Sequence, residues 1–499
     1  MGEISPAQLD GIPAYGLPKP ASPARDIEGE VEGQWIDLMR ILRGLKTVTT
    51  PDLDEPIIKK STEQDIADVR HLSTPDIPRP ISNVIQEAYS IFNHRSRTNH
   101  KGFFSFTPAN VTPLTWLGDV LVSAFNAHCS GSLTAAGPCA VETELVKWFA
   151  SRIHFPSTAG GLFVSGGSIA NMMAMTAARD QKLEWQNYPK GVIYIARQAH
   201  YSHFKAARIL GFHAQQIRTV DSDTFGRLNT NHLEQLIQAD KQNGLIAFLI
   251  MATFGYTETG LIDPLATISE IAQREGLWLH VDGAYGASLS LSLTRSGLAR
   301  QLSTADSVSW DAHKLLFQTY GCGMLLVRDK SHLVSSFHAQ SSFMDHTSRV
   351  KEDEPELWDM GVELTRPSRA MSLWFALRVL GTERIGQLID HGMDLVELIQ
   401  LKLETMREWE VITPASLGII TFRYHPELRK RQEKTLEKLN EDISRILLDT
   451  NTAAVMTVKV NDVLALRICC TNVRLTEEDV LELVKSMDEV ARRLNMCMN

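Results

Sequence analysis

The sequence predicts an α/β fold, with a mostly parallel, helix-covered sheet in a large domain and a small α+β domain after it. Between about residues 111 and 330, short β-branched runs alternate with longer helical stretches, which is the pattern of a parallel sheet. From about residue 385 onward, a long helix, strand-like runs and two further helices follow in a different order. A length of 499 residues is enough for two or three such units.

Six apolar runs are predicted strands of the large domain, at residues 162–164, 192–195, 246–250, 277–281, 307–310 and 324–327. A helix is predicted from about Ile169. In the small domain we expect helices over about 383–407 and 428–448, and strands at 419–422, 454–460 and 464–469. A final helix begins at Thr476, because Asp479 three residues later completes a capping-box pattern.

The N-terminal part has a different composition. Residues 1–25 contain five prolines, which predicts an extended arm, and residues 26–45 carry apolar side chains at helical spacing. A second proline-rich stretch covers residues 75–80. The expected domains are therefore an arm and helical segment over 1–110, the large domain over 111–385 and the small domain over 386–499.

Composition excludes several classes of protein. With 43% hydrophobic and 22% charged residues, the chain is neither disordered nor fibrous as a whole. A net charge of −9 argues against general nucleic-acid binding. Six scattered cysteines without a C-x-x-C pair predict free thiols in a reducing compartment and no metal site. No apolar run is long enough to span a bilayer, so we expect a cytoplasmic protein without membrane attachment.

Glycine-rich or polar residues follow the strands, where parallel sheets bind their ligands. Ser165–Ser168 reads Ser-Gly-Gly-Ser before a helix, which indicates either a phosphate cup or a plain glycine turn. It is not a Walker motif, because no lysine follows the second glycine. His200 and Thr253 follow the next two strands. Two interpretations are open for each residue: it faces a bound ligand, or it belongs to an ordinary polar loop.

Asp282 and Lys314 end two further strands. A carboxylate at Asp282 is costly to bury without a cation, and Gly283 and Ala284 leave room beside it for a flat ligand; the alternative is a turn-capping aspartate. Lys314 follows an apolar strand and precedes Leu-Leu-Phe, which indicates a partly buried, nucleophilic amine; the alternative, common for a single lysine, is a solvated surface charge. A phosphate cup, a histidine, an aspartate and a lysine at one sheet edge together suit pyridoxal 5'-phosphate.

These motifs resemble those of the group II pyridoxal-phosphate-dependent amino acid decarboxylases, the family of the aromatic-L-amino-acid, glutamate and diaminobutyrate decarboxylases. The resemblance spans about residues 80–490. It implies an aspartate-aminotransferase-like fold (PLP fold type I) with a mostly parallel seven-stranded sheet in the large domain. It also implies a homodimer with active sites at the subunit interface, in which the N-terminal segment packs against the other subunit. The segments that carry it are 160–179, 198–200, 252–265, 280–286 and 306–328, with weaker similarity at 137–144, 366–381 and 466–468.

The resemblance also implies roles for individual residues. Lys314 looks like the lysine that forms the Schiff base, Asp282 like the partner of the pyridine nitrogen, and His200 like the residue stacked on the ring. His313 looks like a catalytic neighbour of the lysine, at the phosphate or substrate side. The remaining implied contacts are Gly167, Ser168, Thr253 and Ala284 for the cofactor, and Phe103 and Phe104 for the substrate.

Two positions depart from the family pattern. Asp311 stands where many relatives carry Asn, and we expect its carboxylate to bond backbone or His313 rather than a phosphate. Many relatives also carry a mobile-loop tyrosine that returns a proton after carbon dioxide leaves, but no tyrosine lies between Tyr320 and Tyr424. His346, His200 and Lys314 are the alternative proton donors.

The implied reaction is decarboxylation of an L-amino acid to its amine and carbon dioxide, through a Schiff base on Lys314 and a quinonoid intermediate. Phe103, Phe104 and Phe106 favour an aromatic or apolar substrate, although core packing explains them equally well. The acidic run at 351–356 has two interpretations. It is a solvated loop, or it closes over the site and favours a cationic substrate. The alternatives are an aldehyde synthase, an acidic or diamino acid substrate, another reaction of this fold, and an inactive homologue that acts as a binding partner.

Overall fold

A computed structural model describes residues 53–73, 78–107, 110–339, 355–426 and 432–498. Among them, residues 61–94 form one compact unit, and residues 53–60 with 95–498 form another. The first unit contains α2 (Glu63–Leu72) and α3 (Ile81–Asn93). The side chains of Thr62 and Asp65 cap the start of α2 reciprocally. The predicted arm at 1–25 and the predicted helix at 26–45 lie outside the described residues.

A seven-stranded sheet forms the centre of the second unit, with the order β1-β7-β6-β5-β4-β2-β3. The strand β7 is antiparallel to both of its neighbours, and the other pairs are parallel, so six strands run in one direction. This confirms the predicted mostly parallel sheet. The strands are β1 (Gly160–Val164), β2 (Gly191–Ala196), β3 (Ile217–Val220), β4 (Ile246–Thr253), β5 (Trp278–Asp282), β6 (Ser307–Asp311) and β7 (Gly323–Val327).

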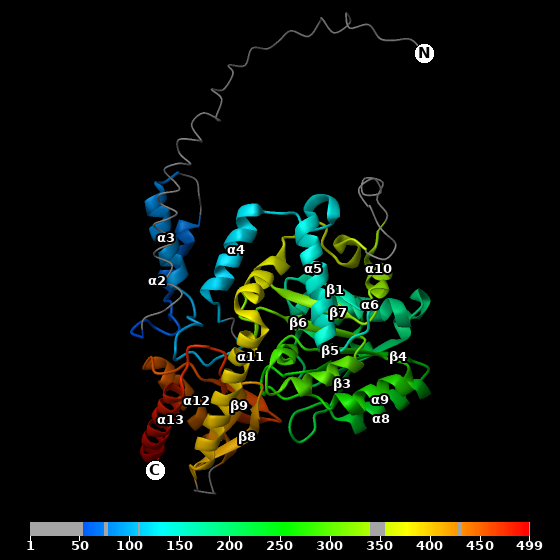
Figure 1. Cartoon of the computed structure of the whole chain (residues 1–499). Helices are drawn as coiled ribbons and strands as arrows, with labels where there is room; N and C mark the ends of the chain where they lie inside the picture. Colours follow the sequence, from blue (N-terminus) through cyan, green and yellow to red (C-terminus); the bar gives the residue numbers. More distant parts are fainter. Residues whose placement is uncertain (1–52, 74–77, 108–109, 340–354, 427–431, 499) are drawn as a thin grey trace, which may run out of the picture. The chain divides into compact units, whose positions relative to one another are not determined.

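Helices cover this sheet (Figure 1). The helix α6 (Gly167–Lys182) packs across β4 to β7 and buries most of its length, because small residues and methionines fill its inner face. It begins two residues before the predicted start at Ile169. The other helices around the sheet are α4 (Pro113–Phe125), α5 (Ser132–Arg152), α7 (Ser202–Ile209), α8 (Thr230–Gln242), α9 (Leu265–Glu275) and α10 (Ser331–Phe337). Short 3₁₀ helices lie at η2 (Trp185–Lys190), η3 (Ala214–Gln216), η4 (Gly286–Leu291), η5 (Ser296–Thr304) and η6 (Leu357–Met360).

A second sheet has four antiparallel strands in the order β10-β11-β9-β8 and its own apolar core. This confirms the small α+β domain. Its elements are β8 (Trp409–Ser416), β9 (Ile419–Tyr424), α12 (Glu433–Asp449), β10 (Met456–Val460), β11 (Val463–Cys469) and α13 (Glu477–Met498). The predicted capping box at the start of α13 is present, since the Asp479 amide donates to Thr476 Oγ1 and the Thr476 amide donates to Asp479 Oδ2.

The long helix α11 (Arg369–Glu404) runs from the large sheet to the small one (Figure 1). Its backbone is non-helical at Gly381, where φ is 73°, so it consists of two helical segments. The predicted helix at 383–407 corresponds to the second segment. The domain boundaries at 110 and 385 stay predictions. Within the described ranges, every helix is too short or too polar to cross a bilayer.

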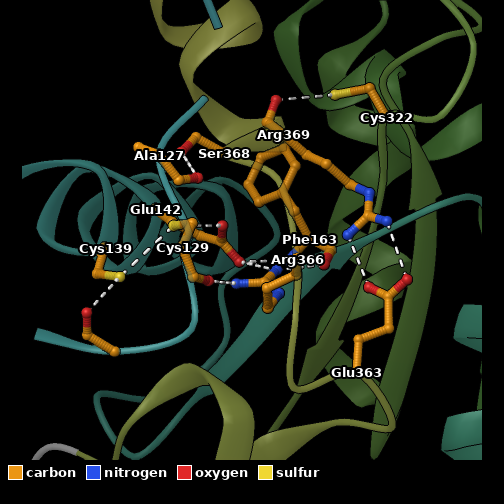
Figure 2. Close-up of polar contacts among 11 residues, drawn as sticks. Ala127, Cys129, Cys139, Glu142, Phe163, Cys322, Glu363, Arg366, Ser368 and Arg369 are labelled. Carbon is orange, nitrogen blue, oxygen red and sulfur yellow. Dashed lines mark hydrogen bonds and ion pairs between the residues drawn. The ribbon is translucent and has the colours of Figure 1, made fainter. Parts of the chain in front are cut away.

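A buried ion pair fixes β1 (Figure 2). Arg366 Nη2 lies 2.6 Å from Glu142 Oε1 and donates to the carbonyl of Phe163, and both charged side chains are fully buried. Glu142 Oε1 also accepts a hydrogen bond from the Phe163 amide. Since buried charges need partners for their hydrogen-bonding atoms, this pair ties α5 and the segment before α11 to the middle of β1.

We expect Arg366→Met to lower the free energy of unfolding by about 3–5 kcal/mol, because it leaves the buried Glu142 carboxylate without a cation. Urea denaturation followed by circular dichroism measures the loss. The matched control is Arg492→Met, which breaks a solvent-exposed pair with Glu408 and Asp488 and costs less than about 1 kcal/mol. Equal losses in the two variants would contradict a structural role for the buried pair.

Candidate active site

A cavity of about 310 Å³ lies at the carboxyl ends of the parallel strands. It brings together eight of the predicted residues, which come from segments far apart in the sequence: Gly167, Ser168, His200, Thr253, Asp282, Ala284, His313 and Lys314. Phe103 and Phe104 do not line it. Both are 2% exposed and belong to the apolar core, so their role as substrate contacts stays a prediction.

The glycine-rich segment between β1 and α6 forms one wall. The amides of Gly167 and Ser168 belong to the first helical turn, whose N–H groups have no carbonyl partner within the helix. A Cβ atom at Gly167 would lie 3.1 Å from both Ala284 Cβ and Asp311 Oδ2, which is closer than side chains normally pack. Gly167 therefore packs tightly against Ala284 and Asp311, and a side chain at this position would require those neighbours to shift.

Asp282 ends β5 and is buried, yet it has a full set of hydrogen-bond donors. Oδ2 lies 2.8 Å from both Asn171 Nδ2 and His203 Nε2. Oδ1 accepts from Ser309 Oγ and from the Ala284 amide, each at 3.0 Å. Burial alone would raise the pKa of Asp282, but the hydrogen bond and charge of His203, together with the charge of Lys314, hold it well below its usual range. The carboxylate is thus ionised at neutral pH.

His203 is the main residue that the sequence analysis missed. It follows His200 by three residues at the start of α7, so helical spacing alone could have suggested that it faces the same side as the site. A carboxylate only accepts hydrogen bonds, so the Nε2 atom of His203 carries the proton that points to Asp282. Its Nδ1 atom is buried and has no hydrogen-bond partner among the described residues.

A second buried histidine, His280, holds Asn171 in place. His280 Nε2 lies 2.9 Å from Asn171 Oδ1, and His280 Nδ1 lies 2.8 Å from Ser307 Oγ. Because Asn171 uses its amide nitrogen toward Asp282, its oxygen must accept from His280 Nε2–H. Neutral His280 then accepts at Nδ1 from the Ser307 hydroxyl. Burial lowers the pKa of His280 to about 3, although the charge of Asp282 acts in the opposite direction.

Lys314 lies on the turn that follows β6, with a side chain that is 21% exposed. This agrees with the predicted partly buried lysine. The turn is tightly built, since the Phe317 amide donates to the Lys314 carbonyl and Phe317 adopts a φ of 58° while buried. A bulky residue rarely adopts such a backbone conformation. Thr115 Oγ1 donates to the Phe317 carbonyl at 2.9 Å and holds the turn in place.

Asp311 connects the lysine to His313. Its Oδ2 atom lies 3.4 Å from both Lys314 Nζ and His313 Nε2. The expectation that Asp311 contacts His313 is therefore confirmed, and the contact with Lys314 is an addition. Asp311 Oδ1 is buried and has no hydrogen-bond partner within the described ranges. Burial lowers the pKa of His313, and the charge of Asp311 opposes this effect.

His200 faces the cavity beside two polar neighbours. Its Nδ1 atom lies 2.8 Å from Ser202 Oγ, and its ring centroid lies 4.3 Å from that of Tyr201. Burial lowers the pKa of His200, and the charge of Lys314 adds to this effect while that of Asp282 opposes it. The imidazole is therefore mostly neutral at neutral pH, which suits contact with a flat aromatic ring better than a charged group would.

Comparison with known proteins identifies the family. The family model described as "Pyridoxal-dependent decarboxylase conserved domain" matches residues 64–425. The chain belongs to this family. As a family member it is a pyridoxal-phosphate-dependent carboxy-lyase that acts on amino acids, with pyridoxal 5'-phosphate as its cofactor.

Relatives of this decarboxylase differ in substrate. It is 32% identical to an aromatic-L-amino-acid decarboxylase of Bacillus atrophaeus over 407 residues. The aligned region covers 82% of this chain and 84% of the relative. It is 26% identical to a cysteine sulfinic acid decarboxylase of Mus musculus, over 83% of this chain and 86% of that protein. The structure of Oryza sativa TDC with PLP and tryptamine has the same fold, with a TM-score of 0.85, 22% identity, and coverage of 96% of this chain and 99% of that one.

The cavity residues of this decarboxylase fit the cofactor. Gly167 and Ser168 line the cavity at the first turn of α6, and helix N-termini of this kind bind phosphate. The ionised, buried Asp282 matches a protonated pyridine nitrogen. The amine of Lys314 lines the same cavity.

We expect acid to destabilise this decarboxylase through His280. In the unfolded chain this histidine binds a proton below about pH 6.5, whereas the folded protein keeps it neutral down to about pH 3. The unfolded state thus binds more protons, so stability falls as the pH falls, by about 1.4 kcal/mol per unit from this group.

His280→Gln removes this contribution, so the free energy of unfolding of the variant should fall less steeply than that of the wild type between about pH 6.5 and pH 4. Urea denaturation at a series of pH values measures the two slopes. His425→Gln, which changes a partly exposed histidine on the small domain, serves as the control. Identical slopes for wild type and His280→Gln would show that His280 does not stay neutral in the fold.

Proposed function

We propose that this decarboxylase converts an aromatic or apolar L-amino acid to the corresponding amine and carbon dioxide. The observation that carries the reaction type is the shared cavity of Lys314, Asp282 and the Gly167 cup. The support for an aromatic substrate is the relative at 32% identity, which is named an aromatic-L-amino-acid decarboxylase.

We assign the cavity residues to the parts of the cofactor as follows. The amides of Gly167 and Ser168 hold the phosphate, Lys314 holds the aldehyde carbon through its amine, and His200 covers a ring face. Asp282 keeps the proton on the pyridine nitrogen. Thr253, Ala284 and His313 complete the walls. Bound pyridoxal phosphate supplies an electron sink for the electron pair left on the α-carbon when carbon dioxide departs.

The protein must also return a proton to the α-carbon. Burial lowers the pKa of both His200 and His313, which disfavours a doubly protonated imidazole as the acid at either position. We therefore assign proton return to Lys314, whose amine reaches the cavity and whose charge Asp311 stabilises at 3.4 Å. His346 lies outside the described residues.

A second candidate reaction is aldehyde synthesis, in which oxygen-dependent deamination accompanies decarboxylation. The observation that favours it is the absence of a tyrosine between Tyr320 and Tyr424 in the sequence. Slow return of the proton to the α-carbon would give oxygen more time to react. We rank this reaction second because it requires oxygen to reach the cavity.

We also propose a homodimer. An apolar stripe on α4 supports it, since Leu117, Leu121 and Phe125 share one helix face and are 40%, 41% and 81% exposed. Large apolar side chains in such a stripe are typical of a surface that a second subunit covers.

The first test is an assay of carbon dioxide release from phenylalanine, tyrosine, tryptophan, glutamate, cysteine sulfinate and 2,4-diaminobutyrate. We expect the highest kcat/KM with an aromatic substrate, and an approximately thousandfold or larger loss in Lys314→Ala. Lys485→Ala, at an exposed position on α13, is the matched control. Ammonia and peroxide measured in the same reactions distinguish the amine from the aldehyde product. A Lys314→Ala enzyme with wild-type turnover would contradict the proposal.

The second test concerns His203 as a positioning residue for Asp282. We expect His203→Leu to lower kcat roughly tenfold to a hundredfold without raising KM, because a hydrogen bond to a charged group contributes about 1.5–3 kcal/mol. The pH dependence of the bound cofactor's absorbance should shift as well, since the pKa of Asp282 depends on this hydrogen bond. His203→Gln retains an N–H donor, so its kcat and its absorbance profile should lie between those of His203→Leu and the wild type. Unchanged kcat and absorbance in His203→Leu would argue that Asn171, Ser309 and the Ala284 amide suffice.

A further inference from the structure

Two buried cysteines lie beside each other near the Glu142–Arg366 ion pair (Figure 2). The Sγ atoms of Cys129 and Cys139 are 3.5 Å apart, although the residues belong to different segments: Cys129 precedes α5 and Cys139 lies within it. Cys139 Sγ also approaches the Gly131 carbonyl at 3.4 Å, and Cys129 Sγ lies 3.8 Å from Glu142 Oε2. All described cysteines are free thiols. The reaction proposed above uses none of them.

The backbone around this pair permits the sulfur atoms to come closer. A disulfide bond is about 2.05 Å long, so the two atoms need to approach by about 1.5 Å. Ala135 is non-helical, with φ of −153° and ψ of 59°, and Pro138 has no amide hydrogen to donate. The helix α5 is therefore irregular between Ala135 and Pro138, directly before Cys139.

Cys139 is accessible to a small molecule. It lines a cavity of about 350 Å³ that shares no lining residue with the cavity at Lys314. Lys147 and Lys330 line the same cavity, together with the carboxylates Glu144 and Glu356. Either sulfur can be the donor in the contact between the two thiols; with Cys129 as the donor, the contact lowers the pKa of Cys139, against the effect of burial. Cys129, in contrast, is fully buried.

We propose that Cys139 and Cys129 form a peroxide-sensitive modification site, in which a small hydroperoxide oxidises Cys139 and Cys129 closes a disulfide bond with it. In the first step the Cys139 thiolate attacks the O–O bond, giving Cys139–SOH and releasing hydroxide or alkoxide. In the second step the Cys129 sulfur displaces that hydroxyl as water and gives up its proton. Two thiols are oxidised by two electrons, and one peroxide is reduced.

The disulfide would form beside the buried Arg366–Glu142 ion pair. The Cys129 amide donates to the Arg366 carbonyl, and the Cys129 carbonyl accepts from Arg366 Nη1, both at 2.9 Å. Arg366 in turn holds Glu142 and the Phe163 carbonyl of β1. A covalent link between Cys129 and Cys139 would therefore clamp α5 directly to the segment that anchors β1.

Peptide mapping of the peroxide-treated holoenzyme tests this proposal. Trypsin releases residues 102–147 as one peptide, because no lysine or arginine lies between Lys101 and Lys147, and its only cysteines are Cys129 and Cys139. After hydrogen peroxide treatment, quenching, and alkylation in denaturant, we expect this peptide without alkyl groups and two hydrogens lighter. Before treatment it should carry two alkyl groups. Dithiothreitol should reverse the change.

Cys322 is the matched control. It is buried, burial raises the pKa of its thiol, and it lies on the separate tryptic peptide 315–328. We expect the Cys129–Cys139 peptide to oxidise at least about tenfold faster than Cys322. Equal rates, or two alkyl groups on the 102–147 peptide after treatment of the folded enzyme, would overturn the proposal.

Two variants distinguish the roles of the cysteines. In Cys129→Ser, Cys139 has no thiol partner, and its sulfenic acid should persist long enough for dimedone to label it. In Cys139→Ser, Cys129 should remain reduced at the same peroxide concentration. Dimedone labelling of Cys129 instead of Cys139 would overturn the assigned order. The wild-type measurement stands even if either variant fails to fold.

Discussion

The site depends on keeping one negative charge buried at the end of β5. The four hydrogen bonds to Asp282 come from α6, α7, β6 and the turn after β5, so they join four separate elements around one carboxylate. Removing a carboxylate from water is costly unless each of its oxygen atoms is bonded. The same donors that stabilise the charge therefore also fix the positions of the elements that surround the cavity.

The small sheet contributes to this cavity without lining it. Arg467 on β11 is buried, and its guanidinium donates to the carbonyls of Thr257 and Phe106. Tyr285, which does line the cavity, donates its hydroxyl to the Leu417 carbonyl beside β9. The loops that follow β4 and β5 are thus held from the far side by backbone contacts to the second sheet.

The sequence was most informative where a buried strand stops. Apolar runs marked β1, β2, β4, β5, β6 and β7, and residues at or after the ends of the five parallel strands among them line one cavity. Two strands were missed for physical reasons. The strand β3 is only four residues long, with Arg218 and Thr219 at its centre, and β8 contains Pro414, which is typical of an edge strand.

The network behind Asp282 could not be predicted in the same way. Asn171, His203 and His280 come from two helices and a strand, and only tertiary packing shows that they meet. Phe103 and Phe104 show a second limit of prediction from sequence. An apolar pair has the same sequence pattern whether it lines a pocket or packs in a core. In the structure both are core residues of this chain.

The order of strands also has a consequence for how the protein folds. The first strand, β1, carries the glycine cup, yet it pairs only with β7, the last strand of the sheet. Lys314 follows β6, on the other side of β7. The cup and the lysine therefore become neighbours only after β7 has inserted between them, when the chain is complete to about residue 327. Cofactor binding then stabilises the finished sheet by mass action, while nascent or truncated chains, which lack the site, gain nothing from it.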